Sequence, residues 1–200
     1  MPGLAVADRI EEPPLAGRSP YHGQRMSLEE FEPLIDIVEP ALEWWDGIVI
    51  QKDVGKRDHG LAQVRVAVRF EPYIERLGGN GWTEAHSWFE GRGYRVPDYA
   101  YWGPRKPQGT SQRSLPPTLA VEVRSEGQSM AAQRAKCRAM RDNGVDVCWL
   151  IDTQHRTLEV FETGRDGKVY RGDATVTSAH LPGFALGLPD LFAPLDRTAP

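Results

Sequence analysis

Three residues of this 200-residue chain, Asp98, Glu122 and Lys136, have the types and spacing of a hydrolytic site. Asp98 follows Pro97 at the edge of one apolar run, and Glu122 lies inside another, Leu119–Val123. The helical pattern that comes next carries Lys136. Two carboxylates and an amine that meet in a fold can hold a divalent metal and act on a phosphodiester. They form such a site only if the remaining elements bring them together.

Glu122 is out of place in a short apolar strand, because a buried carboxylate costs on the order of several kcal/mol unless it is neutralised or paired. Mg²⁺ is one suitable partner, and Asp98, Glu122 and the backbone carbonyl of Val123 would suffice to hold it. Lys136 would then orient or deprotonate the attacking water, or offset the charge of the transition state. A buried salt bridge from Glu122 to Arg124 or Lys136, without a metal, explains the same mismatch.

Charge is unevenly distributed along the chain. Between Arg105 and Arg141 there are eight Lys or Arg residues against Glu122 and Glu126, a local charge of +6, whereas the whole chain carries −4. A basic region around an acidic pair suits a site that cleaves a polyanion, with DNA as the expected partner. A solvated basic helix face gives the same pattern, and the acidic total argues against a general nucleic-acid coat protein.

Length and composition predict one domain with loose ends. Hydrophobic residues make up 40% of the chain, enough for a single core. We expect a flexible N-terminal tail over 1–25, a domain over 26–193 and a C-terminal tail over 194–200. No apolar run is long enough to span a membrane and no signal-peptide pattern is present, so we expect a cytoplasmic protein. The cysteines, Cys137 and Cys148, are expected to be buried apolar residues.

The periodicity predicts an α/β fold with a mixed sheet flanked by helices, preceded by an N-terminal helix and a β-hairpin. A capping box at Ser27 and Glu30 opens the first helix. The hairpin turns at Asp46-Gly47 and carries Glu43 in its first strand. Helices are predicted over 27–38, 58–77 with a break at Pro72, and 130–143; strands over 82–89, 93–102 (which carries Asp98), 119–123, 147–151, 157–161 and 168–171; a mobile loop over 103–117; and an apolar end over 181–192.

The order of these motifs resembles the Uma family of putative endonucleases, within the PD-(D/E)xK restriction-endonuclease-like superfamily. The similarity covers about residues 26–193. It rests on the following segments: Pro97-Asp98, Leu119 to Ser125, Lys136-Cys137-Arg138, Asn143-Gly144-Val145, Cys148 to Asp152, Glu43 to Gly47, Asp58-His59-Gly60 and Leu181 to Phe184. The resemblance implies a restriction-endonuclease-like fold and a metal-dependent DNA endonuclease.

The resemblance also implies roles for single residues. Asp98 and Glu122 would bind Mg²⁺ or Mn²⁺, and Glu43 would be a further acidic member of the site. The signature lysine is expected two residues after Glu122, where this chain has Arg124. The lysine of the family matches Lys136 on the following helix, which leaves Arg124 as a candidate phosphate contact, since a guanidinium stays protonated. The superfamily commonly acts as dimers, so a homodimer stays open, although the sequence has no interface signature.

Other polar and aromatic residues have simpler explanations. His59 at a helix start is more often a structural hydrogen-bonding residue, and Gln133 is by default an exposed helix residue although it could contact a metal-bound water. Of the tryptophans that could stack on bases, Trp149 is expected in the core. Two alternatives to a nuclease remain: a catalytically idle module on the same fold that binds nucleic acid or protein, and a structural protein with a buried ion pair.

Overall fold

A six-stranded mixed sheet forms the centre of the computed structural model, which describes residues 18–110 and 113–197. The strand order is β10-β9-β8-β7-β6-β3, in which β7 and β8 are parallel and the other neighbours antiparallel. The strands are Asn80–Thr83 (β3), Tyr99–Trp102 (β6), Leu119–Arg124 (β7), Val147–Asp152 (β8), Thr157–Glu162 (β9) and Arg165–Tyr170 (β10). The predicted central mixed sheet is therefore confirmed.

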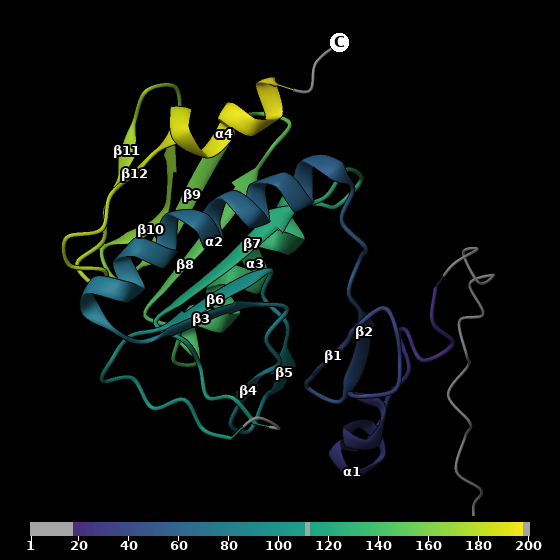
Figure 1. Ribbon diagram of the computed structural model, residues 1–200. Coiled ribbons are helices and arrows are strands. Elements are labelled where there is room, and N and C mark those ends of the chain that lie inside the picture. Colours follow the sequence, from purple (N-terminus) through teal and green to yellow (C-terminus); the bar gives the residue numbers. More distant parts are fainter. Residues whose placement is uncertain (1–17, 111–112, 198–200) are drawn as a thin grey trace, which may run out of the picture.

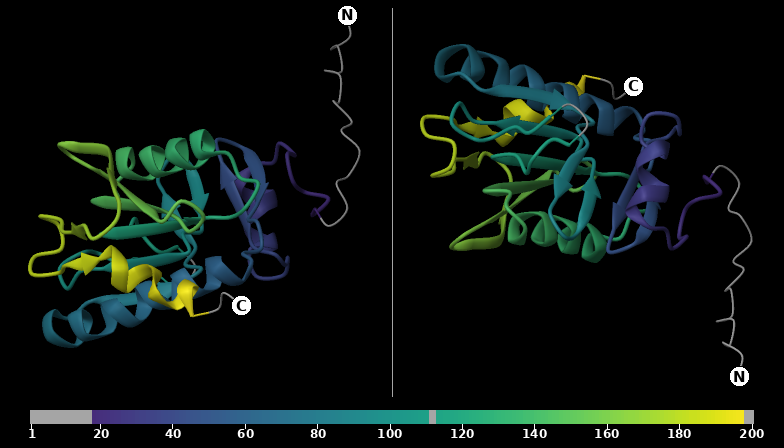
Figure 2. Two further views of the ribbon diagram at one scale, coloured as in Figure 1. Left: turned by 90° about the horizontal axis from the view of Figure 1, so that it is seen from above. Right: turned by 90° about the horizontal axis from the view of Figure 1, so that it is seen from below.

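Helices cover both faces of this sheet. Figures 1 and 2 show α2 (Arg57–Leu77) and α4 (Leu188–Asp196) on one face and α3 (Met130–Asp142) on the other. Under α2, Phe70 stacks on Phe184 with ring centroids 4.2 Å apart. Under α3, Cys137 packs with Cys148 of β8 in a second apolar cluster. Both cysteines are buried and free, as predicted.

The side chains of β7 alternate between these two helical layers, because successive residues of a strand point to opposite faces. Val121 and Val123 join the apolar cluster under α2. Ala120 joins the cluster under α3, so Glu122 and Arg124, two and four residues later, follow it on the α3 face. The alternation therefore places the buried carboxylate of Glu122 beneath the helix that carries Lys136.

A smaller, four-stranded sheet lies beside the large one, with the order β2-β1-β5-β4. Its first two strands form the predicted hairpin, in which Asp46 has φ 52° and Gly47 has φ 84°. Positive φ at both central residues is what a two-residue type I′ hairpin turn requires. The strands are Leu42–Trp45 (β1), Ile48–Gln51 (β2), Ser87–Phe89 (β4) and Gly93–Arg95 (β5).

Two predicted strands are wrong in extent, because each divides between the two sheets. The stretch 82–89 forms β3 of the large sheet and β4 of the small one, and 93–102 forms β5 and β6. Pro97 lies at the second division, where its missing N–H prevents a continuous ladder. Asp98 consequently lies in the bend between β5 and β6, where the two sheets meet.

The helices also differ in detail from the prediction. The capping box is present, but α1 spans only Leu28–Phe31 and continues as a 3₁₀ turn, Glu32–Leu34. Pro33 cannot donate the hydrogen bond that an α-helix needs there. In contrast, α2 continues through Pro72 for 21 residues. Pro72 lies on the exposed side of α2, where the carbonyl that it leaves without a donor can bind water.

The structure also describes residues on the far side of both expected domain boundaries. Residues 1–17 of the predicted tail lie outside the described residues, but 18–25 run along β2, where the Gly23 amide donates to the Val49 carbonyl at 2.8 Å. The apolar end forms β12 (Leu186–Gly187), paired with β11 (Thr175–Val176), and then α4, which continues to Asp196. No helix among residues 18–110 and 113–197 is long and apolar enough to cross a membrane.

Candidate active site

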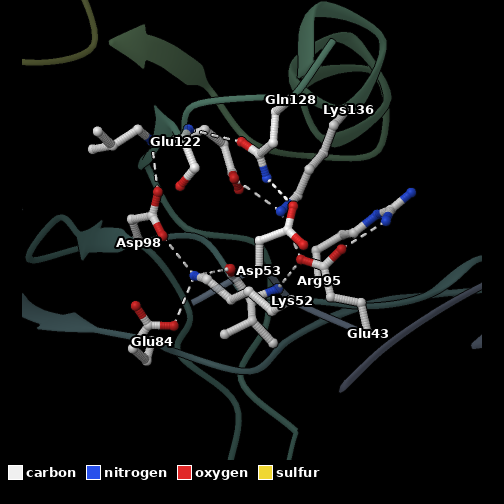
Figure 3. Close-up of polar contacts among 12 residues, drawn as sticks. Glu43, Lys52, Asp53, Glu84, Arg95, Asp98, Glu122, Gln128 and Lys136 are labelled. Carbon is white, nitrogen blue, oxygen red and sulfur yellow. Dashed lines mark hydrogen bonds and ion pairs between the residues drawn. The ribbon is translucent and has the colours of Figure 1, made fainter. Parts of the chain in front are cut away.

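The predicted site residues meet in a cavity of about 480 Å³ that is lined by the small sheet, the end of β7 and the face of α3. Figure 3 shows the side chains of Glu43, Asp98, Glu122 and Lys136 converging there from four separate segments of the chain. The backbone of Val123 and the side chain of Gln133 also belong to the cavity lining. The fold thus brings together carboxylates that are up to 79 positions apart in the printed sequence.

Asp98 is held by contacts on both carboxylate oxygens. Its Oδ2 accepts a hydrogen bond from the Val123 amide at 2.6 Å. Its Oδ1 lies 2.7 Å from Lys52 Nζ and 3.2 Å from His59 Nε2. Burial alone would raise the pKa of Asp98, but the charges of Lys52 and His59 hold it well below its usual range. Asp98 is therefore ionised at neutral pH and fixed against the end of β7.

Lys136 reaches from α3 to two carboxylates at once. Its Nζ lies 2.6 Å from Glu43 Oε1 and 2.8 Å from Glu122 Oε2. Burial alone would lower the pKa of Lys136, but Glu122 and Glu43 raise it well above its ordinary value. These contacts favour the protonated form of Lys136 and thus a role as a fixed positive charge over the role of a base.

Glu43 belongs to the site as an anchor. Its Oε2 accepts from Arg95 Nη1 at 2.7 Å, and its Oε1 accepts from the Val96 amide at 2.9 Å. Burial opposes ionisation, but the charges of Lys136 and Arg95 lower the pKa of Glu43 to about 2. Both oxygens are therefore occupied, and Glu43 positions Lys136.

Two oxygens in this cavity lack an aligned donor. Among the described residues, the buried side-chain oxygens without a hydrogen-bond partner are Asp98 Oδ1, which has only charge contacts, and Glu122 Oε1. Burial raises the pKa of Glu122 to about 7, with Asp98 adding to the effect and Lys136 opposing it. A buried acceptor without any partner, such as Glu122 Oε1, costs on the order of 1–3 kcal/mol.

This donor set fits a hard divalent cation. One unaligned carboxylate oxygen on each of two acids is what Mg²⁺ or Mn²⁺ typically takes from a protein, with water in the remaining positions. No group of three or more His, Cys, Asp or Glu side chains in the described chain forms a metal-binding cluster. A metal would therefore depend on Asp98 and Glu122, with the Val123 carbonyl as the predicted backbone ligand.

Comparison with known families decides the relationship. The model of the Uma2 family, described as "Putative restriction endonuclease", matches residues 28–190. This chain belongs to the Uma2 family. The resemblance inferred from the motifs is thereby confirmed, although the match ends a few residues before the expected end of the domain.

One solved structure has a fold similar to that of this Uma2 protein. A putative nuclease belonging to DUF820 from Anabaena variabilis ATCC 29413 has a TM-score of 0.72 at 23% identity, covering 84% of this chain and 98% of that chain. This likeness shows that the two chains share a fold. A DrdV–DNA complex matches with a TM-score of 0.36 at 14% identity, over 66% of this chain and 11% of that one, which is too low to carry an argument. Among curated proteins, none matches the chain.

Arg124 of the Uma2 chain is occupied elsewhere. Its Nη1 lies 3.1 Å from Asp152 Oδ2 of the neighbouring strand, and its Nε donates to the Gln128 carbonyl at 2.9 Å. In the parallel pair Arg124 stands opposite Asp152, so the ion pair follows directly from the register of β7 and β8. Its predicted role as a phosphate contact would require these contacts to change.

Lys52 is the member of the Uma2 site that the sequence reasoning missed. It follows β2, and its amide donates to the Ala41 carbonyl at 2.8 Å, which extends the hairpin by one pair. The register pairs Glu43 with Ile50. Because side chains two apart share a face, Lys52 lies on the face of Glu43. The Asp46-Gly47 turn fixes that register, so the signal was present in the sequence.

His59 has the predicted structural hydrogen-bonding role at a helix start, and one of its contacts is with Asp98. The side chain is buried, with Nδ1 lying 3.1 Å from Ser125 Oγ and Nε2 close to Asp98. Burial alone would lower the pKa of His59, but Asp98 raises it. His59 therefore links α2 to the carboxylate at the centre of the site. Trp149, in contrast, is fully buried in the core, as predicted.

Most of the basic region between Arg105 and Arg141 is neutralised by acids from elsewhere in the chain. Arg134 pairs with Glu159, and both Arg138 and Arg141 pair with Asp166. The same holds for Lys106 with Asp146, Arg113 with Glu32 and Arg124 with Asp152. The local charge of +6 in the sequence is therefore a weak guide to a DNA-binding surface.

Proposed function

We propose that this protein is a Mg²⁺- or Mn²⁺-dependent endonuclease that hydrolyses phosphodiester bonds of DNA. Asp98 and Glu122 would hold the metal, together with the carbonyl of Val123. The observation that carries the proposal is the pair of buried carboxylate oxygens, one on each acid, that lack an aligned donor. The membership in a family described as restriction endonucleases supports DNA as the substrate.

A bound divalent cation supplies Lewis-acid chemistry, since it polarises a phosphoryl oxygen and makes a water more acidic. The chain itself supplies positioning and charge. The protonated ammonium of Lys136 lies in the cavity wall beside Glu122 and would offset negative charge that develops on the phosphoryl group. Glu43, which is itself held by Arg95, keeps this lysine in place. Asp98 is oriented by the amide of Val123, which ties it to the strand that carries Glu122.

The test is cleavage of a supercoiled plasmid in Mg²⁺, in Mn²⁺ and in chelator, with the wild type and three variants side by side. Asp98→Asn and Glu122→Gln keep the shape of each side chain and remove its charge. The matched control is Asp146→Asn, an acid that pairs with Lys106 outside the cavity. We expect metal-dependent nicking by the wild type and the control and at least a hundredfold loss, on the order of 3 kcal/mol in barrier, in both site variants. Nicking that persists in both would overturn the assignment.

The second candidate is a module on the same fold that binds nucleic acid or protein without cleaving. One observation favours it: each of the three buried acids already has a cationic partner, Arg95 for Glu43, Lys52 for Asp98 and Lys136 for Glu122. A site compensated in this way is stable without a metal. Retention of DNA by the wild type, without nicking in either metal across several substrates, would favour this module. The homodimer suggested by the superfamily belongs to the same set of proposals and is tested by sedimentation.

A further inference from the structure

Lys52 fills a cradle of three oxygens beside the candidate metal site. Its Nζ lies 2.7 Å from Asp98 Oδ1, 2.7 Å from Glu84 Oε2 and 2.7 Å from the Val96 carbonyl. The Val96 carbonyl accepts a hydrogen bond from this ammonium, and the two carboxylate oxygens are charge contacts. The side chain is 11% exposed. Figure 3 shows the Lys52 amine between Asp98 and Glu84.

The cradle is held in place by its own contacts. Glu84 is partly exposed, but its Oε1 accepts from Gln63 Nε2 at 2.8 Å, so that Oε2 stays directed at Lys52. The same Gln63 amide donates to the Asp98 carbonyl at 2.6 Å. One glutamine of α2 therefore fixes both the acid that holds Lys52 and the backbone of the acid that would hold the metal.

The ammonium and the metal have one ligand in common. Asp98 Oδ1 lies 2.7 Å from Lys52, and it is also one of the two buried oxygens without an aligned donor. A carboxylate oxygen has two lone pairs, and His59 Nε2 lies 3.2 Å from this same atom. A divalent cation that binds Oδ1 would therefore meet a positive charge already placed on that oxygen.

We propose that Lys52 is a resident cation that competes with the divalent metal for Asp98 Oδ1 and thereby sets the metal affinity of the site. This inference rests on the proposed metal site. When the metal binds, Lys52 gives up Asp98 and remains attached to Glu84 and the Val96 carbonyl. Lys52 thus weakens metal binding, whereas Glu84 promotes it by retaining the displaced ammonium, without being a metal ligand.

The first test is the affinity of the chelator-treated protein for Mn²⁺, measured by calorimetry. Lys52→Met keeps the aliphatic stem and removes the charge, and we expect its Mn²⁺ dissociation constant to fall by about tenfold or more. Lys106→Met is the matched control, because Lys106 also contacts a carboxylate and a backbone carbonyl, Asp146 Oδ1 and Gly144 O, each at 2.9 Å. An unchanged affinity in folded Lys52→Met would overturn the proposal.

A double-mutant cycle with Glu84→Gln separates competition from a general effect of charge. Under competition, Glu84→Gln weakens Mn²⁺ binding several-fold when Lys52 is present and has little effect in the Lys52→Met background. If Glu84 acts only through its own charge or as a ligand, it weakens binding equally in both backgrounds, which would contradict the proposal. Glu84→Gln alone still tests the inference if Lys52→Met does not fold, because competition requires weaker binding in this variant.

Failure of this inference is distinguishable from failure of the proposed function. If wild type binds Mn²⁺ and nicks DNA while Lys52→Met has the wild-type affinity, only the role of Lys52 is wrong. If neither protein binds Mn²⁺, the metal site itself is wrong and the inference fails with it. Mn²⁺ binding by Lys52→Met but not by the wild type would support the proposal, because it would mean that Lys52 keeps the metal out of the site.

Discussion

The two faces of β7 differ in what they contribute: one packs in the apolar core, and the other carries residues of the candidate site. On the α2 face, Leu119, Val121 and Val123 join a wholly apolar cluster. On the α3 face, the strand begins with apolar Ala120 and ends with the charged side chains of Glu122 and Arg124. The neighbouring strand β8 repeats this pattern, from Cys148 to Asp152. The charges thus gather at the carboxyl ends of the two parallel strands, where α/β sheets commonly bind ligands.

The largest effect on stability is expected on the α2 face. Phe70 is fully buried and contacts Phe184 and Trp149. Phe70→Ala removes a large core side chain, which should lower the free energy of unfolding by about 3–5 kcal/mol. Urea denaturation measures this change. Plasmid nicking per folded molecule should stay at the wild-type level. Loss of nicking in Phe70→Ala without loss of stability would contradict the assignment of a purely structural role to the α2 face.

On the α3 face, Asp152 should contribute less, and in a manner that depends on pH. Burial alone would raise the pKa of Asp152, but His155 and Arg124 lower it. A lowered pKa means that the stabilisation is present above the unfolded pKa and disappears as the pH falls through the folded one. Asp152→Asn should therefore cost about 1–2 kcal/mol at neutral pH. In urea titrations from pH 6 downward, the free energy of unfolding of Asp152→Asn should stay below that of the wild type until about pH 4. Below that pH the two values should converge. A constant difference across this range would contradict the ion-pair explanation.

A smaller change is expected for Arg124→Lys, because the lysine keeps a charge opposite Asp152. We expect the free energy of unfolding to fall by about 1 kcal/mol or less and nicking to stay within a few-fold of wild type.

Lys136→Ala should abolish nicking, since Lys136 is the cation that faces the cavity. Loss of nicking in Arg124→Lys but not in Lys136→Ala would show that Arg124 is the functional cation.

The smallest effect on stability is expected for Glu122→Gln in chelator. Glu122 is a buried acid whose Oε1 has no hydrogen-bond partner, and the neutral amide avoids burying a charge. Lys136 keeps Glu43 as its partner in this variant. We therefore expect a change near zero in the free energy of unfolding at neutral pH, on the order of 1 kcal/mol in either direction. A loss as large as that of Phe70→Ala would place Glu122 among the structural residues.

The sequence allowed the acidic pair and its lysine to be predicted, because a glutamate in an apolar strand is a local contradiction that only a partner resolves. Glu43 came from the family pattern, and the hairpin that carries it from the Asp46-Gly47 turn. The division of 93–102 was missed although Pro97 marks it, since an apolar run conceals a change from one sheet to another. Lys52 was missed because its place on the face of Glu43 follows only when the hairpin register set by the Asp46-Gly47 turn is worked out.

Arg124 shows a different limit of the sequence. Its partner Asp152 lies 28 positions away and meets it only through the parallel register of β7 and β8. The charge count likewise overestimated the basic region, because the acids that neutralise it come from distant strands and helices. A charged residue in an apolar strand could be recognised from the sequence. The distant partner that neutralises a charge could be identified only from the fold.

The most direct test of the metal site is calorimetric titration of Mn²⁺ into chelator-treated wild type, Asp98→Asn and Glu122→Gln, with Asp146→Asn as the control. The site described above predicts one Mn²⁺ per chain in wild type and control, and at least about tenfold weaker binding in each site variant. Equal Mn²⁺ binding by all four proteins would contradict the assignment of Asp98 and Glu122 as the metal ligands.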